Sequence, residues 1–104
     1  MTNITEKAIR PIPVVKDGNG KLIKNYTPKD WFKKLNEELD EVKIAVVNRA
    51  DNLGSAAEIA EELQDLITVC TSMQEWLGFN DVQRGFLAKE INEKNRKRGY
   101  FEEG

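Results

Sequence analysis

The sequence contains no histidine and only one cysteine, Cys70, among its 104 residues. These absences exclude catalytic sites that need histidine, such as the Ser-His-Asp triad and the Cys-His pair, and zinc sites built from histidine or several cysteines. The Glu-x-x-His di-iron bundle is excluded for the same reason. Any metal bound here must therefore have oxygen ligands, which favours hard cations such as Mg²⁺, Mn²⁺ or Ca²⁺.

The chain also lacks a long hydrophobic run and a strong excess of either charge. No apolar stretch reaches the ~18 residues of a transmembrane helix, and the first residues do not form the apolar segment of a secretory signal. Because a single cysteine cannot form an intrachain disulfide, we expect a cytoplasmic protein. Sixteen Lys and Arg against eighteen Asp and Glu give a net charge of −2, which argues against broad binding to nucleic acid or to a membrane surface.

Hydrophobic periodicity and capping signals predict three helices after residue 26, and hence an all-α fold. Candidate N-caps stand at Thr27, Ser55 and Asn80, and Gly78 and Gly99 are candidate helix stops. The predicted helices cover about residues 28–47, 56–77 and 81–98. On the first two, apolar residues recur at helical spacing, from Trp31 to Val46 and from Ile59 to Leu77.

Residues 1–26 differ from the rest of the chain and are expected to form an N-terminal arm. Ile12–Val15, a turn at Asp17–Gly20 and Leu22–Ile23 have the composition of a short β-hairpin. We therefore divide the chain into an arm, 1–26, and a helical domain, 27–104. The apolar stripes of the helices are narrow, so we expect the helical bundle to be completed by oligomerisation.

Carboxylates lie beside the apolar stripes of the first two helices. Glu38 follows Trp31 by seven residues and so lies near the same face, with Glu41 one turn further on. In the second helix Glu62 falls inside the apolar face, and Asp65 lies one turn along. A buried carboxylate is costly unless it is paired or binds a metal. If the two helices pack antiparallel, Glu38, Glu41, Glu62 and Asp65 converge into an oxygen-only site suited to Mg²⁺.

Each of these features also has a simpler interpretation. Acidic residues at helical spacing usually form a solvated face, and Glu62 could pair with Arg49 or Arg84. Trp31 could stack on a nucleobase, although ordinary core packing is the favoured interpretation.

A basic cluster ends the third predicted helix. Lys94 and Arg98 share one face, and Asn95 lies beside them. Lysine, arginine and asparagine together can hold a polyphosphate, but cations are also favourable at a helix C-terminus without any ligand. Nucleic-acid binding is disfavoured because glutamates surround the cluster.

Taken in order, the three elements resemble the MazG-type all-α nucleoside triphosphate pyrophosphatases, in particular the small MazG-like proteins of phages and bacteria. The pattern of that superfamily is E-E-x-x-E, a spacer, E-x-x-D, and then a basic K-N-x-x-R-G-like element. In this sequence the three motifs are Glu37–Glu41, Glu62–Asp65 and Lys94–Gly99. The resemblance covers about residues 28–101, and residues 1–26 have no counterpart in the pattern.

The resemblance implies a helical bundle that assembles as a homodimer or homotetramer. It implies Mg²⁺, or alternatively Mn²⁺, held by Glu38, Glu41, Glu62 and Asp65, with Glu37 as a supporting carboxylate. The implied reaction is hydrolysis of an NTP or dNTP between the α and β phosphates, giving the monophosphate and pyrophosphate. The implied substrate-binding residues are Lys94, Asn95, Arg98 and, for stacking on the base, Trp31.

Two other functions remain open at this point. The chain could be a catalytically inert helical interaction protein, which would keep its acidic residues on the surface and gain no stability from metal. It could also be a relative that acts on another pyrophosphate-linked substrate, such as phosphoribosyl-ATP.

Overall fold

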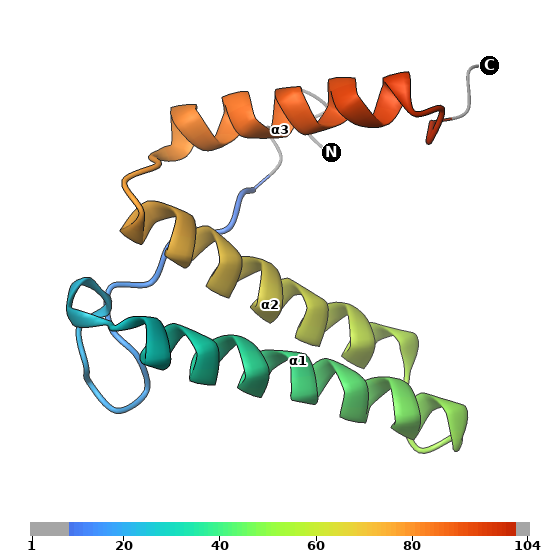
Figure 1. Cartoon of the computed structure of the whole chain (residues 1–104). Coiled ribbons are helices and arrows are strands. Elements are labelled where there is room, and N and C mark those ends of the chain that lie inside the picture. The colour runs from blue at the N-terminus through green and yellow to red at the C-terminus, as the bar shows by residue number, and fades with distance from the viewer. Residues whose placement is uncertain (1–8, 102–104) are drawn as a thin grey trace, which may run out of the picture. The chain divides into compact units, whose positions relative to one another are not determined.

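The computed structural model describes residues 9–101, which form a short irregular arm and three long helices (Figure 1). A 3₁₀ turn, η1 (Ile23–Asn25), precedes α1 (Pro28–Ala50), α2 (Ala56–Trp76) and α3 (Asp81–Lys97). The all-α class is therefore confirmed, and no β-strand occurs within residues 9–101. None of the described helices combines the length and the apolar character that crossing a membrane requires.

The described chain divides into two compact units, and the boundary falls inside α2. The first unit runs to Met73 and the second begins at Gln74. In the first unit α1 and α2 lie side by side and antiparallel, joined by the loop 51–55 (Figure 1). The second unit contains the end of α2, the turn that follows it, and α3.

The helix starts follow the capping signals of the sequence. Thr27 and Asp30 form a reciprocal capping box at α1, and Asn80 and Gln83 form another at α3. At α2 the Ser55 hydroxyl accepts a hydrogen bond from the Glu58 amide at 3.2 Å. These contacts satisfy amides that have no partner within the helix.

Each of the three α-helices is followed within two residues by a residue with a left-handed backbone conformation. The first helix continues to Ala50, three residues beyond the predicted end, because no helix-breaking residue intervenes before the left-handed Asn52 (φ 61°). Gly78 (φ 96°) and Gly99 (φ 74°) follow α2 and α3 in the left-handed conformation that glycine adopts without a steric penalty.

The buried face of the first unit is rotated from the predicted apolar stripe. On α1 the buried residues are Trp31, Glu38 and Ala45, spaced by seven, and on α2 they are Val69 and Ser72. Predicted stripe residues lie further out: 41% of Leu39, 47% of Val46 and 42% of Leu63 are exposed. Small residues such as Ala45 and Ser72 allow close packing but contribute little to a hydrophobic pattern, so periodicity alone misplaced the centre of the face.

The arm packs on both helices of the first unit. In place of the predicted hairpin it has one isolated antiparallel bridge, Lys16 to Leu22, around the turn 17–20. The Val14 amide donates to the buried Ser72 hydroxyl of α2 at 3.0 Å. At the start of α1 the Lys21 ammonium lies 2.8 Å from the Asp30 carboxylate.

Candidate metal centre

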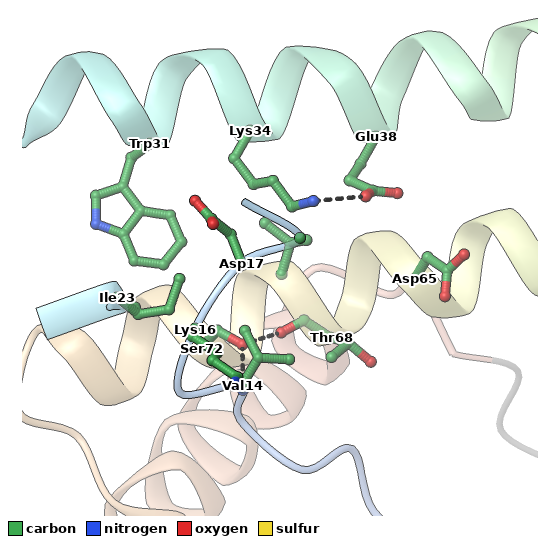
Figure 2. Close-up of a pocket in the computed structure, with 12 residues that line it drawn as sticks. Val14, Lys16, Asp17, Ile23, Trp31, Lys34, Glu38, Asp65, Thr68 and Ser72 are labelled. Atoms are coloured by element: carbon green, nitrogen blue, oxygen red, sulfur yellow. Dashed lines mark hydrogen bonds and ion pairs between the residues drawn. The ribbon is translucent and has the colours of Figure 1, made fainter. Parts of the chain in front are cut away.

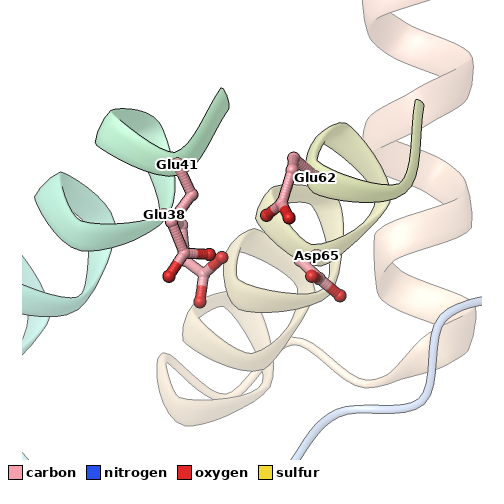
Figure 3. A group of neighbouring side chains, drawn as sticks. All are labelled: Glu38, Glu41, Glu62 and Asp65. Atoms are coloured by element: carbon pink, nitrogen blue, oxygen red, sulfur yellow. The ribbon is translucent and has the colours of Figure 1, made fainter. Parts of the chain in front are cut away.

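Four carboxylates from α1 and α2 converge in the first unit. Glu38 and Glu41 come from α1, and Glu62 and Asp65 come from α2 (Figure 3). Each offers one carboxylate oxygen, and these four oxygens all lie within 4.8 Å of one another. Spacing of three residues on each helix puts both members of a pair on one face, and antiparallel packing brings the two faces together. The convergence predicted from the sequence is thus present in the structure.

Two oxygens of this carboxylate cluster are buried and unsatisfied. Glu38 is buried, with only 8% of its surface exposed, and Glu62 is half-buried. The Oε2 atoms of both residues are shielded from solvent and have no hydrogen-bond partner within residues 9–101. An unsatisfied buried carboxylate oxygen is unfavourable. Because all the donors are oxygens, this group fits a hard divalent cation of the Mg²⁺ or Mn²⁺ type.

Lys34 is the cation that contacts this cluster. It lies one turn before Glu38 on α1, and its Nζ atom is 3.3 Å from Glu38 Oε1 (Figure 2). Sequence analysis missed this residue, although the i,i+4 spacing of Lys34 and Glu38 is itself a sequence signal for an ion pair. Among residues 9–101, one ammonium beside four carboxylates leaves an excess of negative charge at the site.

The arginine partners considered for Glu62 do not account for its buried oxygen. Arg84 belongs to the second unit, where its guanidinium pairs with Glu75 and donates to the Phe79 carbonyl at 2.6 Å. Arg49 is exposed near the end of α1. Among the described residues, the Oε2 atom of Glu62 has no hydrogen-bond partner, and Glu62 forms no ion pair with either arginine.

Two cavities adjoin the cluster. The arm cavity, of about 320 Å³, lies between the arm and the two helices and is lined by Glu38 and Asp65 together with Asp17, Trp31 and Lys34 (Figure 2). The loop cavity, of about 350 Å³, is lined by Glu41 and Glu62 and by further glutamates. Each volume falls in the range of small-molecule sites, roughly 300–1,000 Å³. The carboxylates therefore stand where a bound small molecule can reach them.

Trp31 is a core residue in this structure. Only 1% of its surface is exposed, and its ring meets Tyr26 edge to face with centroids 4.9 Å apart. Its side chain contributes to the wall of the arm cavity. The favoured interpretation as core is consistent with this burial, and stacking on a nucleobase stays a prediction.

Glu37 lies apart from the four converging carboxylates. It is exposed and lines a smaller cavity of about 290 Å³ with Asp17, Tyr26 and Lys34. Its role as a supporting carboxylate stays a prediction.

The predicted polyphosphate-binding residues belong to the second unit. Lys94 and Asn95 lie in the last turn of α3, and Arg98 caps that helix, with its amide donating to the Lys94 carbonyl at 3.1 Å. Lys94 and Arg98 are exposed and Asn95 is half-buried. Their side chains are accessible to a ligand, and their substrate role stays a prediction.

Ionised carboxylates hold the arm in place. The Tyr26 hydroxyl donates to Asp17 Oδ2 at 2.7 Å, and this bond lowers the pKa of Asp17. Burial raises the pKa of Tyr26 above its usual range, and the bond to Asp17 adds to the effect. The hydrogen bond from Lys21 lowers the pKa of Asp30 to about 2. Both aspartates are therefore charged at neutral pH, and both anchor the arm beside its cavity.

Comparison of the chain with protein-family models, curated proteins and solved structures finds no match. A functional proposal for this chain therefore depends on its carboxylates, its cavities and the order of its motifs.

Proposed function

We propose that this protein is a Mg²⁺-dependent nucleotide pyrophosphohydrolase, which also accepts Mn²⁺. It cleaves an NTP or dNTP between the α and β phosphates and releases the monophosphate and pyrophosphate. The observation that carries the proposal is the convergence of Glu38, Glu41, Glu62 and Asp65 with two buried, unsatisfied carboxylate oxygens. The order of the sequence motifs then favours nucleotide hydrolysis over other uses of a divalent cation.

The four carboxylates are assigned to hold the cation. When bound, a divalent cation neutralises phosphate charge and lowers the pKa of water. Glu38 and Asp65 face the arm cavity, and Glu41 and Glu62 face the loop cavity. A substrate bound in either cavity reaches two of the carboxylates, and one that is not occupied by the cation can take the proton of the attacking water.

Lys94, Asn95 and Arg98 are assigned to the leaving pyrophosphate. An ammonium, an amide and a guanidinium supply charge and hydrogen-bond donors to developing negative charge on phosphate oxygens. We further propose that the active form is a homodimer or homotetramer. Exposed apolar side chains on α1 support this assembly, because 60% of Ile44 and 57% of Val47 are exposed.

The same apolar surface favours a second candidate, an inert helical interaction protein. That function needs no cation, so it predicts that Mg²⁺ neither stabilises the fold nor supports turnover. The pyrophosphohydrolase requires both effects.

Charge-neutralising variants of α2 test the proposal. Glu62→Gln and Asp65→Asn should lower nucleotide turnover by at least about 100-fold, because each removes a metal ligand. Asp40→Asn is the control, since Asp40 is an exposed acid of α1 that lies outside the group of four and lines neither of the two cavities. Circular dichroism should show an unchanged helix content in all three proteins. Full activity in either ligand variant would make the metal assignment wrong.

A further inference from the structure

Lys34 occupies the position where a metal cation and a substrate would meet. Its ammonium pairs with Glu38, whose side chain is 11% exposed, while the Lys34 side chain is 31% exposed. The pair is thus largely, though not fully, removed from water. Lys34 also lines the arm cavity, where Glu38 and Asp65 form part of the wall.

The pairing of Lys34 with Glu38 is incomplete. Lys34 contacts Glu38 Oε1, whereas Glu38 Oε2 is buried and has no hydrogen-bond partner among the described residues. In the part of the chain that the structure describes, the one ion pair made by the four carboxylates is that of Glu38 with Lys34. A divalent cation bound to the group would satisfy Oε2 and would also repel the ammonium, so the cation and Lys34 compete for the same carboxylate.

Lys34 has an alternative environment within reach. A lysine ammonium is a compact charge on a flexible four-carbon stem. Besides the arm cavity, Lys34 lines the smaller cavity of about 290 Å³ beside Asp17 and Glu37. The charge of Lys34 helps to lower the pKa of Asp17, which shows that the ammonium and this carboxylate of the arm attract each other. Because Asp17 lines both cavities, an ammonium that leaves Glu38 and turns toward Asp17 still faces an anion bound in the arm cavity.

We propose that Lys34 is a placeholder for the metal. Its ammonium neutralises Glu38 in the metal-free protein, and binding of a divalent cation releases it to bind a phosphate of the substrate in the arm cavity. The first half concerns only the cation, and the second half rests on the proposed function. Lys34 thereby links loading of the metal to recognition of the polyphosphate.

Titration with Mn²⁺ in the absence of nucleotide tests the competition between the cation and Lys34. Electron paramagnetic resonance measures the concentration of free Mn²⁺ at each step. Lys34→Met should bind Mn²⁺ about two- to fivefold more tightly than the wild type, since a partly exposed ion pair no longer has to be broken. Lys43→Met is the control, because Lys43 is an exposed lysine of the same helix. Lys34→Gln provides a second variant should methionine impair folding. Unchanged or weaker Mn²⁺ binding by a folded Lys34 variant overturns the proposal, as does the absence of Mn²⁺ binding by the wild type.

The second half is tested with inorganic tripolyphosphate at saturating Mg²⁺, by isothermal titration calorimetry. Lys34→Met should bind tripolyphosphate about tenfold more weakly than the wild type, because a charge-assisted contact is lost. The proposal predicts tighter Mn²⁺ binding and weaker tripolyphosphate binding by the same variant. If Lys34 had a merely structural role, its replacement would weaken the binding of both ligands. Equal tripolyphosphate affinity in variant and wild type overturns the phosphate role.

Turnover is a separate readout. A wild-type protein that hydrolyses no nucleotide contradicts the proposed function, while the Mn²⁺ titration still decides the competition.

Discussion

Replacing Glu38 by glutamine should stabilise the metal-free protein and remove most of its stabilisation by Mg²⁺. Glu38→Gln keeps the shape of a buried side chain and removes one of the four converging charges. Repulsion between two carboxylates at 4.8 Å is about 0.9 kcal/mol in a water-like dielectric. The attraction of Glu38 to Lys34 at 3.3 Å is about 1.3 kcal/mol on the same scale.

Three repulsions outweigh one attraction, so the metal-free variant should be more stable than the wild type by about 1 kcal/mol. For a domain of this size, 1 kcal/mol raises the melting temperature by about 4–8 °C. In EDTA the variant should therefore melt at the higher temperature, even though it has lost an ion pair.

Mg²⁺ should stabilise the wild type selectively. For a site with a dissociation constant of about 1 mM, about 10 mM Mg²⁺ contributes roughly 1.4 kcal/mol to the free energy of unfolding. This corresponds to a rise in melting temperature of about 6–11 °C. Because Glu38→Gln has lost a buried metal ligand, Mg²⁺ should raise its melting temperature by less than about 2 °C.

Thermal melts followed by circular dichroism, in EDTA and in MgCl₂ with NaCl added to match the ionic strength, measure both effects. Asp40→Asn is the control, because Asp40 is an exposed acid of α1 outside the group of four. It should respond to Mg²⁺ like the wild type. An equal Mg²⁺ shift in Glu38→Gln, or a lost shift in Asp40→Asn, would refute the assignment of the site.

Two further predictions concern the arm. Ser72→Ala removes the hydroxyl that accepts the Val14 amide, so the free energy of unfolding in urea should fall by about 1–2 kcal/mol and the Val14 amide should exchange faster with solvent. Thr71→Ala, which loses a hydroxyl that donates to the Ile67 carbonyl of its own helix, should leave the exchange rate of the Val14 amide unchanged. The pKa of Asp30 is lowered to about 2 from 3.8, so the stability it contributes is present above about pH 4 and is lost as the pH falls through 2. Asp30→Asn should therefore lower the melting temperature at pH 7 and flatten its decline between pH 4 and 2, and an unchanged decline would contradict the role of that carboxylate.

The sequence predicted those features that depend on short-range chemistry. Capping boxes at Thr27 and Asn80 involve residues three apart, so the helix starts could be inferred without any tertiary information. The convergence of the carboxylates needed only the i,i+3 spacing on each helix and antiparallel packing. Both conditions follow from helix geometry and a short connection.

The remaining features depend on contacts between distant parts of the chain. The Val14–Ser72 hydrogen bond joins residues 58 apart and has no sequence signal. Nor does a sequence signal indicate that Asp17 of the arm lines the arm cavity. The rotation of the buried face toward Glu38 also escaped prediction, because Ala45 and Ser72 fill space without adding to hydrophobic periodicity. The i,i+4 spacing of Lys34 and Glu38 was visible in the sequence. Such pairs of opposite charge are so common on helices that the spacing alone does not identify a functional residue.

Product analysis tests the central claim most directly. The purified protein is incubated with a panel of NTPs and dNTPs in Mg²⁺, the nucleotides are separated, and pyrophosphate is assayed. We predict monophosphate and pyrophosphate in equal amounts from at least one substrate, with the reaction abolished by EDTA. Diphosphate with orthophosphate, a reaction that persists in EDTA, or no turnover of any nucleotide would contradict the proposed function.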